Sequence, residues 1–224
     1  MVNYNTFLHG YNLEVKADGK CSPMGSPPAT LGQFPLRHPY RFYRFLCDLD
    51  DLVESVSDDL ERIRIAAVLT RHFLTQATWI TETCPVPDQD QRVAGKSLYG
   101  EPGYPFIIQV VAWLPQRSPV HNHANWSIVG YLGDEMAGCE HNSFWCRQDD
   151  GLKKGHAIIK KASQQILKPG DIIGFTPDAI HSIVSIPCEK GIDSKPTYTF
   201  NIFGETDFSQ RYEFDPLNNT LKKF

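Results

Sequence analysis

The chain has 224 residues, of which 41% are hydrophobic, enough for the core of one domain with appendages or of two small domains. Its formal net charge is −4, and its Lys and Arg residues are scattered among acidic ones. This excludes the basic stripe that binds a phosphate backbone, so we expect no nucleic-acid partner. No segment approaches the roughly 20 apolar residues of a membrane span, and the N-terminus lacks the apolar run of a signal peptide. We therefore expect a cytoplasmic protein without membrane contact.

The N-terminal part of the chain divides into an arm and a helical segment. Residues 1–38 are rich in Gly, Pro and Ser and predict an irregular arm on the surface. Residues 39–90 place apolar side chains at helical spacing and predict two helices over about 40–82, with Ser57 as an N-cap. Each helix has one polar face, so its apolar side should pack on something larger.

After a loop at 84–105, the hydrophobic pattern changes to short apolar or alternating runs separated by turn signals. These runs predict strands at 105–113, 126–132, 135–147, 156–160, 163–167, 171–175, 181–186, 196–203 and 211–214. Many short strands without intervening helices indicate a β-barrel or sandwich within 91–224, including a C-terminal tail. We expect arm, helices and strands to form one structural domain.

Six cysteines are spread along the chain without a Cys-x-x-Cys pair, and the chain is too large to need a disulfide framework, so free thiols are expected. The spacing Cys139-x-His141-x4-Cys146 has the form of a zinc half-site, but it lies in a strand-like run and we assign it no metal. His141 and His156 receive no role.

Three histidines carry the chemistry that the sequence predicts. His121 and His123 stand two apart where a strand begins, so both imidazoles project from the same face. His181 opens a later strand, after a Pro-Gly-Asp turn, and in a closed barrel that strand can return opposite the first pair. Three imidazoles occupy one face of an octahedron and leave cis positions open. We therefore predict that they bind one divalent transition metal.

The stretches SLYGEPGYPFIIQVVAW, HNHANWSIVGYLGDE and GDIIGFTPDAIHSI resemble the cupin superfamily and, within it, the cysteine dioxygenase or thiol dioxygenase family, over about 96–203. The resemblance implies a mainly β protein, with a cupin double-stranded β-helix (jelly-roll) barrel preceded by two α-helices. It also implies that His121, His123 and His181 bind iron(II). The usual cupin carboxylate ligand after the His pair is missing, since Trp126, Ser127 and Ile128 stand there.

The sequence also departs from the family pattern in its substrate pocket. The family's Arg before the Tyr turn has no direct match, and Arg92 or Lys96 would have to replace it. Ser127 is the nearest counterpart of a cross-linked cysteine. The late Ser-x-His-x-Tyr pattern reads Thr199, Asn201 and Phe203, which we place on the inward face of their strand. Gln109 either faces solvent or lines the cavity, and Trp126 packs beside the metal histidines as core.

The preferred function is therefore an iron(II) dioxygenase whose partners are dioxygen and a small thiol-bearing molecule. Zinc, manganese and nickel are the alternative metals. Two other functions stay open: a zinc or manganese cupin hydrolase or isomerase, and a non-catalytic cupin that binds a small ligand. A homodimer is left open as well. With no certain Arg in the pocket, free L-cysteine would lose its carboxylate partner on binding, so we expect it to be a poor substrate.

Overall fold

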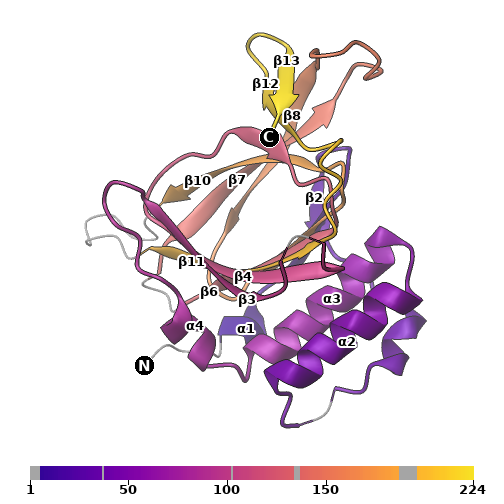
Figure 1. Cartoon of the computed structure of the whole chain (residues 1–224), viewed down its shortest axis with the longest axis vertical. Coiled ribbons are helices and arrows are strands. Elements are labelled where there is room, and N and C mark those ends of the chain that lie inside the picture. Colours follow the sequence, from indigo (N-terminus) through magenta and orange to yellow (C-terminus); the bar gives the residue numbers. More distant parts are fainter. Residues whose placement is uncertain (1–5, 37, 102, 134–136, 187–195) are drawn as a thin grey trace.

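The computed structural model describes residues 6–36, 38–101, 103–133, 137–186 and 196–224, and it is mainly β with helices on one side (Figure 1). The helices are α1 (Thr6–His9), the 3-10 helix η1 (Ala29–Gln33), α2 (Phe42–Ser55), α3 (Asp59–Leu74) and α4 (Trp79–Thr83). The two helices expected over 40–82 correspond to α2 and α3, followed by the short α4. Asp58, one residue after the predicted Ser57, caps α3, because its side chain accepts a hydrogen bond from the Glu61 N–H.

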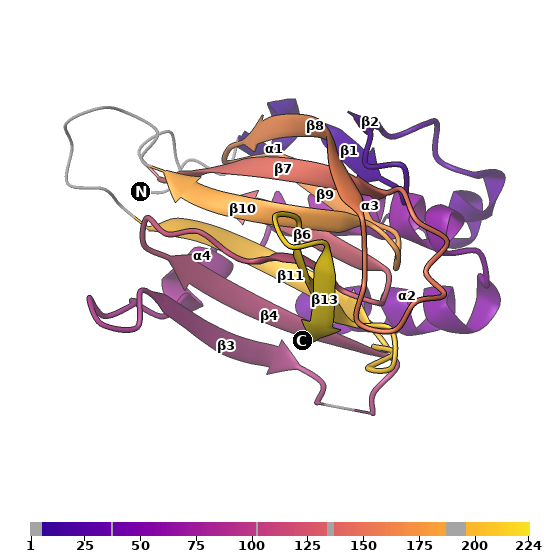
Figure 2. The ribbon, with the colours of Figure 1, turned by 90° about the horizontal axis from the view of Figure 1, so that it is seen from above.

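The described strands form two sheets. The seven-stranded sheet has the order β2 (Cys21–Pro23), β1 (Asn12–Val15), β9 (Ile172–Phe175), β6 (Ser127–Leu132), β11 (Thr197–Gly204), β4 (Phe106–Trp113), β3 (Val93–Tyr99). The six-stranded sheet has the order β13 (Thr220–Lys223), β12 (Tyr212–Asp215), β5 (Val120–Asn122), β10 (Ile180–Ile186), β7 (Cys139–Arg147), β8 (Ile159–Leu167). The sheets face each other, and Figure 2 shows their long strands running in similar directions, as in aligned sheet packing.

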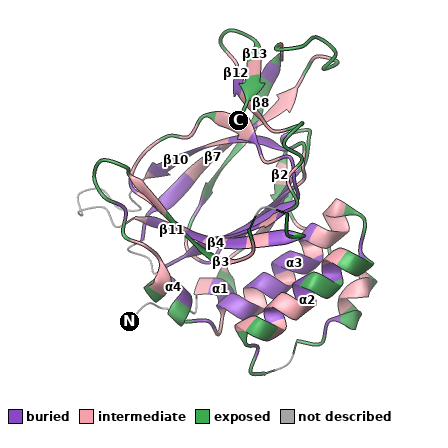
Figure 3. Cartoon of the chain, in the orientation of Figure 1, coloured by how far each residue is buried: buried purple, intermediate pink, exposed green. Residues whose placement is uncertain are grey.

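Helices α2 and α3 cover the outer face of the seven-stranded sheet, and their sheet-facing sides are buried while their outer sides are exposed (Figure 3). Phe45 of α2 stacks on Phe73 of α3 with ring centroids 4.6 Å apart. Phe200 of β11 lies 5.8 Å from Phe73, between ring centroids. These three rings are at most 1% exposed, so they join helices and sheet in one apolar core.

The predicted irregular arm is wrong for two stretches, because the arm supplies the strands β1 and β2. Strand β1 pairs in parallel with β9, which lies 157 or more residues away in the chain. The Arg64 guanidinium on α3 donates two hydrogen bonds of 2.8 Å to the buried Glu14 carboxylate in β1. The same guanidinium holds the pKa of Glu14 below its usual value. Local turn signals carry no information on such distant partners.

The strand predictions differ from the structure in several places. The predicted loop at 84–105 contains the edge strand β3, and the separate runs 156–160 and 163–167 contribute to one strand, β8. The strand expected to begin at the His pair is divided, because β5 ends at Asn122 and β6 begins at Ser127. Strand β13 was not expected as a strand. The runs at 105–113, 126–132, 171–175, 181–186, 196–203 and 211–214 correspond to β4, β6, β9, β10, β11 and β12. Run 135–147 corresponds to β7, and its residues 135 and 136 lie outside the described residues.

The prediction of free thiols is wrong for Cys139, which is disulfide-bonded. Cys21, Cys47, Cys84 and Cys146 are free, and Cys188 lies outside the described residues. Burial raises the pKa of the Cys21 thiol to about 11 and that of Cys84 to about 12, so these two thiols are unreactive near neutral pH. Within the described parts of the chain, no helix combines the length and apolar character that crossing a membrane requires.

A first prediction concerns the contact between α3 and the sheet at Gly174 of β9. A Cβ atom there would clash with Ile63 Cγ2, on a stiff β-branched side chain of α3. Gly174→Ala should therefore lower the free energy of unfolding by about 1–3 kcal/mol through overpacking, measured by urea denaturation. Gly95→Ala in β3 is the matched control, because its Cβ would meet Val111 Cγ2 at an ordinary 3.8 Å. Equal stability of the two variants would contradict this packing.

Candidate metal centre

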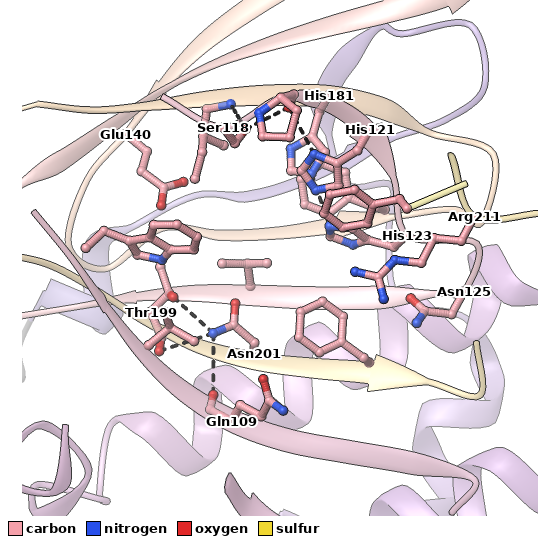
Figure 4. A pocket seen from close by; sticks show the side chains of 18 of the residues that line it. Gln109, Ser118, His121, His123, Asn125, Glu140, His181, Thr199, Asn201 and Arg211 are labelled. Carbon is pink, nitrogen blue, oxygen red and sulfur yellow. Dashed lines mark hydrogen bonds between the residues drawn. The ribbon is translucent and has the colours of Figure 1, made fainter. Parts of the chain in front are cut away.

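The imidazoles of His121, His123 and His181 converge on one point of the six-stranded sheet (Figure 4). His121 lies in β5 directly opposite His181 in antiparallel β10, so both side chains project from the same face. His123 follows β5 by one residue. One ring nitrogen from each histidine lies within 4.8 Å of the others, and the Nε2 atoms of His123 and His181 are 3.1 Å apart. Two nitrogens this close share either a proton or a metal ion.

Asn122 and Ala124 fix the direction of the His pair. The Asn122 side chain points to the other face, donating to the Gln210 carbonyl at 2.9 Å and accepting from the Tyr212 N–H at 2.8 Å. These bonds hold β5 against the segment that opens β12. Ala124 has a φ of 55°, a left-handed conformation that is unfavourable for a residue with a Cβ. The chain accepts this strain where it turns from β5 into β6, directly after the second histidine.

Each histidine is held through the ring nitrogen that faces away from the convergence point. Nδ1 of His121 lies 3.1 Å from the Pro119 carbonyl oxygen, which can only accept, so this nitrogen carries the proton. Nδ1 of His181 lies 3.2 Å from Asn142 Oδ1, and Nδ1 of His123 lies 2.8 Å from Ser127 Oγ. With Nδ1 protonated, the Nε2 lone pairs point inward, the arrangement typical of metal-binding histidines.

The three imidazoles are also kept in the neutral form that binds a metal. Burial lowers the pKa of His123 and of His181 well below the usual value, and the neighbouring imidazoles lower both further. Burial likewise lowers the pKa of His121, against the hydrogen bond to Pro119, which raises it. The donor set, the tautomers and the charge state therefore fit a divalent transition metal, and no carboxylate belongs to the group.

The histidines line a cavity of about 510 Å³ between the two sheets. Its wall comes from the inward faces of β4, β6, β9 and β11 of one sheet and of β5, β7 and β10 of the other. The lining includes Ile107, Gln109, Val111, Trp113, Arg117, Asn125, Val129, Tyr131, Glu140, Phe175, Ile183, Thr199, Asn201, Phe203, Arg211 and Phe224. This volume suits a small organic molecule rather than a macromolecule.

Four of the predicted pocket residues line this cavity: Gln109, Thr199, Asn201 and Phe203. The inward face expected for β11 is thus the observed one, while Phe200 and Ile202 on its other face join the helix-covered core. The Asn201 amide nitrogen donates to Thr199 Oγ1 at 3.0 Å, and Figure 4 shows the amide oxygen pointing into the cavity.

Four other candidates do not line the cavity. The Arg92 guanidinium donates to the Pro115 carbonyl instead. Lys96 is exposed, and its pairing with Val110 puts it on the opposite face of the sheet from Gln109. Trp126 is buried in the core under the helices, with the Arg62 guanidinium 5.7 Å from its ring centroid. Ser127 serves as the hydrogen-bond partner of His123.

Arg211 is a pocket residue that sequence reasoning missed. It directly precedes β12 and lies in the cavity wall, with its guanidinium 4.6 Å from the Phe224 ring centroid. The Phe224 ring stacks on His121, with ring centroids 5.1 Å apart. The expectation that L-cysteine is a poor substrate rested in part on the lack of a certain Arg in the pocket, and Arg211 removes that part of its basis. Only the long-range pairing of β12 with β5 brings Arg211 here, and no local pattern signals it.

Glu140 is the second missed residue, a buried carboxyl group in the cavity wall that is 3% exposed. Its Oε2 accepts hydrogen bonds from the Tyr131 hydroxyl at 2.6 Å and from Asn142 Nδ2 at 3.2 Å. Burial raises the pKa of Glu140 to about 6, and the two hydrogen bonds limit that rise. Asn142 thereby connects Glu140 to His181. No local sequence pattern signals this network, because Tyr131 and His181 belong to other strands than Glu140.

No protein-family model matches the chain. The chain matches parts of several solved structures, among them a cupin superfamily protein from Desulfitobacterium hafniense, with 12% identity and a TM-score of 0.36, covering 53% of this chain and 83% of that one. KdgF from a Halomonas species has 13% identity and a TM-score of 0.35, with 53% and 85% covered. An oxalate oxidase has 14% identity and a TM-score of 0.38, with 58% of each chain covered. Similarities this low establish neither a family nor an activity.

A second prediction concerns the three ligands. His123→Ala and His181→Ala each leave two imidazoles, a much weaker chelate, so we expect neither variant to retain stoichiometric iron(II) or zinc after dialysis. The loss of affinity should exceed the roughly 10–100-fold that removal of a supporting hydrogen bond costs. Metal analysis and calorimetric titration measure it. His141→Ala and His156→Ala are controls that should keep the metal, and full metal content in His181→Ala would refute the three-ligand site.

A third prediction concerns acid. The lowered pKa values of the three histidines mean that the unfolded chain, with histidine pKa near 6.5, takes up more protons than the folded protein. The free energy of unfolding of metal-free protein should therefore fall as pH drops through about 7 to 5. Glu140 acts oppositely: its raised pKa gives stability below about pH 4.5 that is lost as pH rises through about 6.

Comparison with His123→Gln isolates the histidine contribution. Each neutral buried histidine steepens the pH dependence by up to about 1.4 kcal/mol per pH unit, so the variant should show the shallower slope in urea denaturation at pH 7.5, 6.5 and 5.5. Identical slopes for the two proteins would show that His123 is not held neutral by the fold.

Proposed function

We propose that the chain is a cupin-type barrel that binds iron(II) and uses dioxygen to oxidise a small thiol-bearing molecule. The observation that carries the proposal is the convergence of three neutral imidazole Nε2 atoms, with no carboxylate among them, on the wall of a cavity between two facing sheets. The two sheets and the position of the histidines on β5 and β10 support the jelly-roll interpretation. Zinc, manganese and nickel are the alternative occupants of this donor set.

His121, His123 and His181 would hold the metal through Nε2. Iron(II) held there would supply a redox-active Lewis acid for the oxidation of a thiol by one dioxygen to a sulfinic acid, with both oxygen atoms on sulfur. Three neutral ligands do not reduce the positive charge at the site as a carboxylate would, so an anionic thiolate is favoured there.

Apolar rings around the histidines keep water away from them. The Phe175 ring centroid lies 4.6 Å from that of His181 and 5.6 Å from that of His123. The Phe203 ring lies 5.2 Å from that of His123, between centroids. These rings restrict how the imidazoles turn and lower the local dielectric, which strengthens charge interactions inside the cavity.

The opposite wall presents hydrogen-bonding groups to a bound molecule. The Asn201 amide nitrogen is occupied by Thr199 Oγ1 and by the Gln109 carbonyl oxygen, at 3.0 Å and 3.4 Å. Its amide oxygen is thereby directed toward the cavity, where it can accept a hydrogen bond from a substrate N–H or O–H (Figure 4). Asn201 therefore orients the substrate rather than taking part in proton transfer.

One observation favours a second candidate, a zinc or manganese hydrolase or isomerase. Glu140 lines the cavity with a pKa raised to about 6, a value suited to moving a proton near neutral pH. In such an enzyme the metal would polarise the substrate and Glu140 would act as general acid or base. Dioxygen would take no part.

A fourth prediction separates the two candidates. Iron-loaded protein should consume one dioxygen per sulfinate formed when supplied with a thiol from a panel of L-cysteine, cysteamine and 3-mercaptopropionate, measured with an oxygen electrode and mass spectrometry. Zinc-loaded protein and iron-treated His123→Ala are the controls and should show no thiol-dependent uptake. Absence of uptake by iron-loaded protein with every thiol would refute the dioxygenase proposal.

A further inference from the structure

Besides the histidines and the exposed Arg117, the cavity lining contains two charged side chains, Arg211 and Glu140. Figure 4 shows Arg211, with Asn125 below it, on the side of the histidines, and Glu140 at the far side. Apolar side chains, including Val111, Val129 and Ile183, also line the cavity. The two charges do not pair with each other, so each is available to a ligand.

Among the residues that the structure describes, no carboxylate forms an ion pair with the Arg211 guanidinium. Its Nε is buried and has no hydrogen-bond partner within the part of the chain that the structure describes, and its guanidinium contacts the face of the Phe224 ring. A guanidinium has five N–H donors in a fork that matches a carboxylate. Leaving such donors unpaired in a partly buried site is costly, and a carboxylate ligand removes that cost.

Hydrogen bonds to the neighbouring backbone fix Arg211 close to the candidate metal site. Asn122 stands between His121 and His123 in the sequence. Its side chain binds the Gln210 carbonyl and the Tyr212 N–H, and these two residues flank Arg211. The backbone that carries Arg211 is therefore fixed to the backbone that carries the histidines. A metal ion in that site would add positive charge beside Arg211, and this increases the need for an anion there.

Glu140 is the complementary group. Both of its hydrogen bonds from described residues, those of Tyr131 and Asn142, go to Oε2, so Oε1 remains to accept from a ligand. The structure gives it no Lys or Arg partner among the described residues, although it is 3% exposed. Its carboxyl group points into the cavity (Figure 4). A buried carboxylate without a cation is best satisfied by a ligand ammonium group.

We propose that the cavity binds an elongated zwitterion whose carboxylate is held by Arg211 and whose protonated amine, separated from it by an apolar chain, is held by Glu140. A purely anionic ligand would satisfy Arg211 and leave Glu140 unpaired, and a purely cationic ligand would do the converse. An α-amino acid carries both groups on one carbon and reaches only one end at a time. This assignment rests on the proposed function, because it names the class of substrate that the same cavity binds.

The test is calorimetric binding to metal-free protein with probes that carry no thiol, so its failure is distinct from failure of the oxygen-uptake experiment. The probes are 5-aminopentanoate, pentanoate and pentylamine. The zwitterion should bind at least tenfold more tightly than either singly charged analogue. In the series from glycine to 6-aminohexanoate, affinity should rise with chain length to a maximum. Pentanoate binding as tightly as 5-aminopentanoate, or a series without length dependence, would overturn the proposal without any variant.

Two variants test which side chain holds the carboxylate of the ligand and which holds its amine. Arg211→Gln should weaken 5-aminopentanoate and pentanoate at least tenfold and leave pentylamine unchanged. Glu140→Gln should weaken 5-aminopentanoate and pentylamine and leave pentanoate unchanged. Arg117→Gln, which removes an exposed cation of the cavity wall, is the matched control and should change each affinity less than threefold. Equal effects of Arg211→Gln on all three probes, in a variant with wild-type circular dichroism and melting temperature, would refute the assignment.

Discussion

The convergence of three neutral imidazoles inside a largely apolar cavity is the constraint on which the rest of the structure depends. Burial disfavours their charged forms, so each ring needs a neutral hydrogen-bond partner on its outer nitrogen to fix the tautomer. The chain supplies three different partners: a backbone carbonyl at Pro119, a hydroxyl at Ser127 and an amide at Asn142. The antiparallel pairing of β5 with β10 then aligns His121 and His181.

The seven-stranded sheet and the helices behind it close the cavity around the histidines. In strand β11, Phe200 and Ile202 pack under α2 and α3, while Thr199, Asn201 and Phe203 line the cavity. A strand with both faces buried is held by its core contacts, so its polar inward groups stay in place. The N-terminal strand β1 extends this sheet and is tied to α3 through Glu14 and Arg64.

The sequence predicted the features of the site that depend on local strand geometry. The two-residue spacing of His121 and His123 and the alternation along β11 follow from strand geometry alone. The sequence did not predict the residues that reach the cavity through pairing between distant strands. Arg211 reaches the cavity because β12 pairs with β5, and Glu140 is buried because β7 lies between β10 and β8. The arm reads as turn-rich, yet β1 pairs with a strand far along the chain. Arg92 and Lys96 were the cations nearest in sequence to the position of the family's Arg, and both lie outside the cavity lining.

We propose that Nε2 of His121, His123 and His181 together hold one metal ion. Anomalous diffraction at the iron edge from crystals of iron-loaded protein tests it most directly. We expect one strong peak per chain at about 2.0–2.2 Å from all three Nε2 atoms. Density at another group of side chains, ligation through Nδ1, or a carboxylate in the coordination sphere in place of one histidine would contradict it.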